Sequence, residues 1–380
     1  MKILIIGAGI GGLTLANLLR QREPAIQVQL VERSAEPESS RPESGGTLAL
    51  KEPGGLTALQ RLGIYEDLRR VGKPVTDFRF LTADGKLLMT LREPPPSAAR
   101  GTTWRVPRSA LHHQLLRDVK DLIRFGTVCT GYHSRDGKPA ADFENGEEES
   151  ADLVVACDGV KSVVRRHMIG DEPHYLDLAA ITGAIPAAAP HPLLRDGPVM
   201  MVGDGSTLLA DQEYESIGWA LTLHARYHEF EQLTHLDLQQ RVLLATREWY
   251  SPVRALIEDT RPEDIAVLGG FYDRNPLRRA HDGNVMLLGD AAHPMSPFRG
   301  EGANMAMLDA LVLADSLRYF GKEEQLEAVI SRYEREMLAR TRRAILLSRR
   351  AAREMHTRNL ITRSIRDAKL RLANQFMARR

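Results

Sequence analysis

The chain has 380 residues and a net charge of +1, with 43% hydrophobic and 27% charged residues. These proportions are typical of globular proteins and exclude a disordered, collagen-like or coiled-coil chain. Two cysteines are too few for a disulfide scaffold or a cysteine-rich zinc site, so we expect no metal centre and a reducing, cytoplasmic location. No apolar run reaches the roughly 20 residues of a membrane span, and early glycines interrupt any signal peptide.

The first thirty residues have the pattern of a strand, a glycine turn, a helix and a second strand. Gly7 permits the tight turn, Gly9 lets the backbone approach a pyrophosphate, and Gly12 allows close packing of helix on strand. Glu32 ends the second strand 20 residues after Gly12, where a carboxylate accepts hydrogen bonds from a ribose. Its neighbour Arg33 is a candidate to stack on adenine. The segment therefore predicts a dinucleotide site, for either FAD or NAD.

Two later segments repeat the change from an apolar run to a turn. Residues 152–156 lead into Asp158-Gly159, and residues 284–288 lead into Gly289-Asp290, followed by a helix from about 302 to 318. Because parallel sheets bind ligands at the carboxyl ends of their strands, we expect all three turns to meet around one cofactor.

The remaining segments differ in character. Residues 73–105 and 170–264 carry β-prone runs separated by prolines and glycines. We predict an α/β fold in which a Rossmann-like domain of residues 1–72, 106–169 and 265–320 contains an inserted β-rich domain, 73–105 and 170–264, and is followed by a C-terminal helix in 321–380.

The C-terminal segment is strongly basic. Residues 331–380 hold 15 Lys and Arg against 4 Asp and Glu, a net charge of +11, which leaves −10 for the rest of the chain. Such a block is typical of an arm for nucleic acid or anionic lipid, or of a helix docked on an acidic body. We favour one long helix over 323–376, straight or with a kink, whose apolar stripe is buried against the body, because apolar residues recur at helical spacing: Ile361, Ile365, Ala368, Leu372 and Phe376.

Two of the turns carry a family resemblance. D-G-V-K-S-V-V-R, from Asp158 to Arg165, resembles the D-G fingerprint of the single-component flavin hydroxylases, and G-D-A-A-H-P-M-S-P-F-R-G-E-G-A-N resembles their G-D fingerprint. The resemblance implies the p-hydroxybenzoate hydroxylase fold, with FAD in the Rossmann-like domain and the substrate in the inserted one. Within this family, Gly45–Leu50 and Pro297–Asn304 are most similar to the tetracycline-inactivating TetX-type enzymes.

The resemblance also implies roles for individual residues. Asp290 would bond the ribityl hydroxyls, and Arg108 would contact the phosphate-ribityl stretch. Pro297 would lie over the reactive edge of the flavin, with Gly300 beside it as the second catalytic position. The family usually has Gln at Glu301, whose role is left open. The cofactor-binding residues so expected are Gly7, Gly9, Gly12, Glu32, Arg33, Arg108, Asp158, Asp290, Pro297, Gly300, Gly302, Ala303 and Asn304.

The activity implied is hydroxylation by a C4a-hydroperoxyflavin, with NADPH or NADH as reductant and O2 as co-substrate. The substrate would be an electron-rich aromatic, polyketide or tetracycline-like ring, which suggests a role in antibiotic resistance. We expect a monomer without nucleic-acid partner or membrane span. Two alternatives stay open: an FAD oxidase or reductase that inserts no oxygen, and a non-catalytic carrier of the GDP-dissociation-inhibitor type on a related fold.

Overall fold

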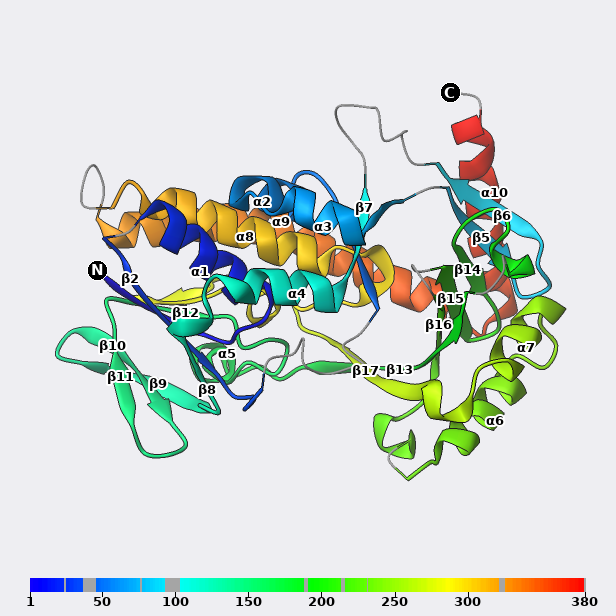
Figure 1. Cartoon of the computed structure of the whole chain (residues 1–380), viewed down its shortest axis with the longest axis horizontal. Helices are drawn as coiled ribbons and strands as arrows, with labels where there is room; N and C mark the ends of the chain where they lie inside the picture. The colour runs from blue at the N-terminus through cyan, green and yellow to red at the C-terminus, as the bar shows by residue number, and fades with distance from the viewer. Residues whose placement is uncertain are drawn as a thin grey trace. The chain divides into compact units, whose positions relative to one another are not determined.

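The computed structural model describes residues 1–23, 25–36, 46–75, 77–92, 103–187, 191–212, 216–230, 232–320 and 325–378 (Figure 1). The chain divides into two compact units. The first consists of Met1–Lys73, Thr103–His174 and Tyr272–Arg349, and the second of Pro74–Thr102, Tyr175–Phe271 and Arg350–Arg380. Gly45, the first residue of one quoted motif, lies outside the described ranges. The predicted boundaries of independently folding domains stay a prediction.

The first unit is built on a six-stranded sheet in the order β18-β19-β12-β1-β2-β8. Its middle strand β1 is the run KILII, whose last four residues are buried, as expected for a strand covered on both faces. It pairs in parallel with β2 and β12, and β12 pairs in parallel with β19. The strands are β1 (Lys2–Ile6), β2 (Gln27–Glu32), β8 (Ile123–Phe125), β12 (Leu153–Ala156), β18 (His281–Asp282) and β19 (Val285–Leu287).

The register of this sheet brings the three predicted turns to one edge. Ile6 at the end of β1 lies opposite Ala156, and Ala156 lies opposite Leu287. The chain then enters the turns at Gly7, Asp158 and Gly289. The α/β fold expected from the sequence is confirmed, and the three fingerprints meet as parallel pairing requires.

Helices pack beside the sheet (Figure 1). α1 contacts both α4 and α8, and α2 contacts α8. Residues 12–19 of α1 are buried, which explains why this part of the helix is mostly apolar on all sides. The helices of this part are α1 (Ile10–Arg22), α2 (Gly55–Leu62), α3 (Tyr65–Val71), α4 (Arg108–Arg117), α5 (Val163–Ile169) and α8 (Gly302–Leu317).

Two small sheets accompany the six-stranded sheet of the first unit. One has the order β3-β7-β4, and its strand β7 ends where α4 begins, so that it places Arg108. The other is an antiparallel sheet in the order β11-β10-β9. The strands are β3 (Thr47–Leu50), β4 (Lys73–Pro74), β7 (Trp104–Pro107), β9 (Cys129–Arg135), β10 (Lys138–Phe143) and β11 (Glu148–Ser150).

The second unit contains a seven-stranded sheet in the order β17-β13-β16-β15-β14-β5-β6, with α6 and α7 beside it. Trp219 is buried there and donates from its indole nitrogen to Thr260 at 2.9 Å, so it is a core residue. The elements are β5 (Phe78–Thr82), β6 (Leu87–Leu91), β13 (His174–Pro186), β14 (Val199–Val202), β15 (Ser206–Gln212), β16 (Ser216–His224), α6 (His235–Ala245), α7 (Ser251–Glu258) and β17 (Ile265–Asp273).

The C-terminal segment differs from the prediction in two ways. It forms two helices, α9 (Leu326–Met355) and α10 (Leu360–Ala378), where the sequence predicts one. The break needs no Gly or Pro, because Asn359 accepts a hydrogen bond from the Thr362 backbone at 3.0 Å and so starts a new helix. The stripe predicted to be buried is exposed, at Ile361, Ile365, Ala368, Leu372 and Phe376. Among the described residues, no helix is long and apolar enough to span a membrane.

Candidate cofactor site

A cavity of about 750 Å³ opens at the sheet edge where β1, β2 and β12 end. Its lining includes the glycine turn, the end of β2, the start of α4 and the D-G turn. Of the residues predicted to bind the cofactor, the lining contains Gly7, Gly9, Glu32, Arg33, Arg108 and Asp158.

The three glycines of the first turn differ in what a Cβ atom would contact at each position. Gly7 has φ +103°, and a Cβ there would overlap the Cys157 carbonyl. A Cβ at Gly12 would overlap the Gly7 carbonyl and lie 3.3 Å from the Cys157 Cβ. Around Gly9, by contrast, a Cβ would meet nothing within 4 Å. The turn therefore leaves open space at the cavity and the N-terminus of α1, which is the form of a phosphate cradle.

Glu32 holds this turn in place. One carboxylate oxygen accepts a hydrogen bond from the Ala8 backbone at 2.8 Å, and the other accepts from the Ser34 backbone at 2.9 Å. A carboxylate offers about four acceptor positions, so Glu32 has capacity left for a ribose hydroxyl in the cavity that it lines. On the opposite side, His112 Nε2 lies 3.1 Å from the Ala8 carbonyl.

The D-G turn leaves an acceptor without a partner. Asp158 Oδ2 accepts from the Val163 backbone at 2.9 Å, while Oδ1 is buried and has no hydrogen-bond partner among the described residues. Burial also raises the pKa of this carboxyl group. Because buried polar atoms are nearly always paired, an unpaired oxygen in the cavity lining fits a site that receives a polar ligand. These residues thus fit a bound dinucleotide.

Arg108 connects this cavity to the G-D turn. It is the first residue of α4 and lines the cavity, and its charge acts on Asp290. The Asp290 side chain is accessible to solvent, yet the surrounding protein desolvates it enough to raise its pKa. Arg108 thus lines the cavity and acts electrostatically on Asp290, and its contact with a phosphate-ribityl chain stays a prediction.

Behind the G-D turn lies a buried charge cluster that positions it. Asp309 of α8 accepts from His293 Nε2 at 2.5 Å, from the Gly289 backbone at 3.2 Å and from Arg340 of α9 at 2.6 Å. Burial alone would raise the pKa of Asp309, but the charges of His293 and Arg340 outweigh burial and hold that pKa below its usual value. Burial would lower the pKa of His293, and Asp309 overcomes this and raises it. His293 is thus a buried partner of Asp309.

The residues of the G-D segment differ in their exposure to solvent. Asp290, Pro297 and Gly300 are exposed, whereas His293 and Asn304 are buried. Pro297 begins a short 3-10 helix, η7 (Pro297–Arg299), and Gly300 ends it with φ +62°. The segment therefore exposes three of the residues predicted to face a flavin, together with Arg299, while residues 291–294 and Ser296 are buried.

Helix α8 begins at Gly302, directly after these exposed residues. The backbone N–H groups of its first turn, which includes Ala303, have no partner within the helix and are available to a negatively charged ligand. The side chain of Asn304 is occupied within the protein, and the predicted contact of this residue with the cofactor stays a prediction. Its amide donates to the Ala49 and Gly300 carbonyls and accepts from the Lys51 and Gly55 backbones. All four hydrogen-bonding positions are used, so this amide clamps the β3 loop to α8.

Two further features were not anticipated from sequence. Lys51 Nζ lies 2.6 Å from Glu301 Oε1, so the carboxylate whose role was left open has a cationic partner. Arg165 is fully buried, pairs with Asp171 at 2.6 Å, and donates to the Ala292 carbonyl at 2.7 Å. It thereby ties the D-G segment to the G-D turn. The only sequence signal for the contact between Lys51 and Glu301 is that Lys51 directly follows the G-T-L-A-L run.

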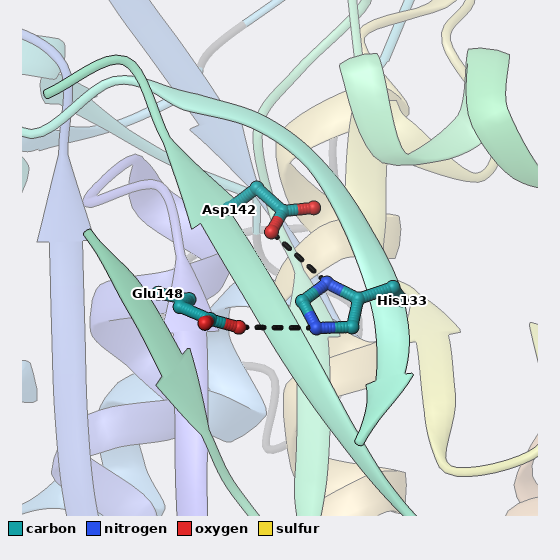
Figure 2. A group of neighbouring side chains, drawn as sticks. All are labelled: His133, Asp142 and Glu148. Carbon is teal, nitrogen blue, oxygen red and sulfur yellow. Dashed lines mark ion pairs between the residues drawn. The ribbon is translucent and has the colours of Figure 1, made fainter. Parts of the chain in front are cut away.

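One group of side chains has the spacing of metal ligands among the residues described, His133, Asp142 and Glu148 on the β9–β11 sheet (Figure 2). The imidazole lies between the two acids, with Nδ1 3.0 Å from Asp142 and Nε2 3.1 Å from Glu148. Arg135 holds the other Glu148 oxygen at 3.0 Å. Each ring nitrogen faces a different acid, so the imidazole links the two carboxylates. The expectation of no metal centre stays a prediction.

Comparison with known families identifies the site. A model described as "FAD binding domain" matches residues 1–175 and 271–348. This match covers more than half of the chain and includes all the turns described above. The chain belongs to this FAD-binding domain family.

Individual relatives cover most of the chain. It is 28% identical to the 3-amino-4-hydroxybenzoate 2-monooxygenase of Streptomyces cremeus, over 94% of this chain and 88% of the relative. It is also 28% identical to the aurachin C monooxygenase/isomerase of Stigmatella aurantiaca, over 88% and 84%. Klebsiella pneumoniae HpxO complexed with FAD and uric acid has the same fold, with a TM-score of 0.85, 23% identity and coverage of 98% and 92%.

These findings define the class of the enzyme. The chain is a flavoprotein oxidoreductase of the FAD-dependent monooxygenase type, with the p-hydroxybenzoate hydroxylase fold. The alternative of a non-catalytic carrier is therefore set aside. The likeness to TetX-type enzymes within the family stays a prediction.

Proposed function

We propose that this enzyme uses NAD(P)H, with NADPH as the first candidate, and O2 to hydroxylate an electron-rich aromatic or polyketide ring. The observation that carries the proposal is that Asp290, Pro297 and Gly300 are exposed, whereas residues 291–294 and Ser296 of the same G-D segment are buried. FAD, when bound, accepts a hydride from the nicotinamide and activates O2 for transfer of one oxygen atom.

The chain's own residues would bind and orient the cofactor. The α1 N-terminus and Arg108 supply positive charge for the pyrophosphate, and Glu32 accepts from the ribose. Asp290 would accept hydrogen bonds from the ribityl hydroxyls. The first N–H groups of α8 would stabilise negative charge at the flavin edge, and Pro297 would cover the reactive edge and restrict water there.

The substrate class is supported by the relatives. Their names include a 3-amino-4-hydroxybenzoate 2-monooxygenase and a 6-hydroxynicotinate 3-monooxygenase, which act on small hydroxylated rings. We therefore propose a hydroxylated aromatic or heteroaromatic ring as the first substrate class. A tetracycline or a related polyketide, with a role in antibiotic resistance, is the finer candidate, and it rests on the motifs Gly46–Leu50 and Pro297–Asn304.

Purified protein tests the cofactor first. We expect yellow protein that releases FAD on denaturation, whereas colourless protein that cannot be reconstituted with FAD would contradict the proposed function. Light scattering at the same stage tests the expectation of a monomer.

The reaction is tested with hydroxybenzoates, hydroxynicotinates and tetracyclines in turn. NADPH or NADH consumption is followed, and the product formed under isotopically labelled O2 is weighed by mass spectrometry. A productive substrate should accelerate NAD(P)H oxidation and gain one labelled oxygen atom. Peroxide formation without a labelled product from any substrate would favour an oxidase, and reduction of the substrate in the absence of O2 would favour a reductase.

A further inference from the structure

Helix α10 presents an apolar stripe to solvent. Ile361, Ile365, Leu372 and Phe376 are 72%, 48%, 54% and 62% exposed. With Ala368, they recur every three or four residues and so share one face of the helix. Single exposed apolar residues are ordinary, but a continuous stripe over four turns is unusual and marks a binding surface.

The other face of α10 attaches the helix to its own unit. It packs on β6, where the Thr90 backbone donates to Asn374 at 2.9 Å. Arg366 is buried and donates to the Met355 carbonyl at 3.2 Å, and Arg363 pairs with Asp204 at 3.3 Å. The packed face thus combines these polar groups with the partly buried Leu370, Ala373 and Met377. The stripe is a second apolar face, and it points outward, unlike the single inward apolar face of an ordinary surface helix.

Basic residues border the stripe. At 100° per residue, Lys369 and Arg371 flank it on its two sides, and both are exposed, as is Arg358 before the helix. Lys369 also makes a long, exposed pair with Glu354 at 3.4 Å, which an anionic surface would have to replace. The one acid of α10, Asp367, is mostly covered and pairs with Arg366 at 2.8 Å. Two copies of the stripe brought face to face would place like charges together, which disfavours self-association. The charge pattern instead complements an anionic surface.

We propose that α10 docks the enzyme reversibly on an anionic lipid surface. The apolar stripe would enter the boundary between headgroups and acyl chains, and the flanking cations would contact the anionic headgroups. The helix is held on β6 with this face outward, so docking needs no rearrangement of the unit. The proposal is independent of the substrate and of the oxygen chemistry.

Vesicle flotation of the full-length holoprotein tests this inference. Binding is expected to vesicles containing phosphatidylglycerol, to weaken with salt, and to be much lower for phosphatidylcholine alone. The double substitution Leu372→Gln and Phe376→Gln should lower the affinity roughly tenfold or more, because it removes two large apolar groups from the contact. Lys369→Gln with Arg371→Gln should weaken binding and reduce its salt dependence.

A matched control is Leu244→Gln on α6, which alters an equally exposed leucine away from the stripe, at 58% exposure. It should bind vesicles as the wild type does. All variants should keep their FAD and circular dichroism, which separates a docking defect from misfolding. Equal vesicle binding by wild type and the stripe variant would overturn the proposal. A wild-type dimer that the stripe variant dissociates, without vesicle binding, would assign the stripe to a second copy instead.

Discussion

Replacing Asp309 by asparagine would remove the charge that organises the back of the G-D turn. The carboxylate is fully buried and lies 2.5 Å from His293 and 2.6 Å from Arg340. Breaking a buried ion pair by removing one partner costs about 3–5 kcal/mol. We expect about 3 kcal/mol here, at the lower end, since Arg340 is 20% exposed and regains some hydration in the variant.

The pH dependence of this loss follows from the two pKa shifts. The raised pKa of His293 contributes stability below the usual histidine value of about 6.5, and this is lost as pH rises through the folded-state pKa. The lowered pKa of Asp309 contributes stability above the usual value of about 3.9, lost as pH falls through the folded-state pKa. The difference in the free energy of unfolding between the wild type and Asp309→Asn should therefore be largest between about pH 3.9 and about pH 6.5.

Urea titration provides the measurement, with far-UV circular dichroism for the whole chain and FAD fluorescence for the first unit. Asp315→Asn on the same helix is the matched control, because its pair with Arg61 is long, at 3.5 Å, and exposed. It should cost less than about 0.5 kcal/mol. If the free energy of unfolding of Asp309→Asn stays within about 1 kcal/mol of the wild-type value across this pH range, the buried charge cluster does not stabilise the G-D turn. The reasoning is then wrong.

Three further substitutions test residues proposed to lie near the cofactor. Asp290→Ala should weaken FAD binding by about 1.5–3 kcal/mol, one to two decades in Kd, without unfolding the protein; an unchanged Kd by fluorescence titration would make Asp290 a turn residue only. Lys51→Met should leave Glu301 as an unpaired negative charge beside α8 and lower the midpoint potential of bound FAD, whereas Glu301→Gln should raise it. Spectroelectrochemical titration measures both shifts, and an unchanged potential in both variants would place the ion pair outside the influence of the flavin.

The glycine turn was predictable because each of its requirements is local. The run KILII, the spacing of Gly7, Gly9 and Gly12, and Glu32 at the end of the next strand all lie within 32 residues. Parallel pairing then brings the other two fingerprints to the same edge, since strand ends in such a sheet coincide. Local pattern and sheet geometry together predict the parts of the cavity lining that come from the glycine turn, the end of β2 and the D-G turn.

Contacts between distant residues were not predictable in the same way. Lys51 and Glu301 are 250 residues apart, and nothing in either neighbourhood requires the other. The division of the C-terminal segment was missed because Asn359 starts a helix by a side-chain hydrogen bond, a weaker signal than Pro or Gly. Helical periodicity correctly located the stripe of α10, but periodicity alone does not decide whether a stripe faces its own protein or a partner.

The link through Arg165 has a consequence for biosynthesis. Its acceptor, the Ala292 carbonyl, is made 127 residues later, after most of the second unit has left the ribosome. Until then the guanidinium has neither this acceptor nor the G-D turn, and the nascent chain holds only part of a cofactor site. FAD can therefore be captured fully only late in translation, and flavin uptake by truncated chains would report how far assembly has progressed.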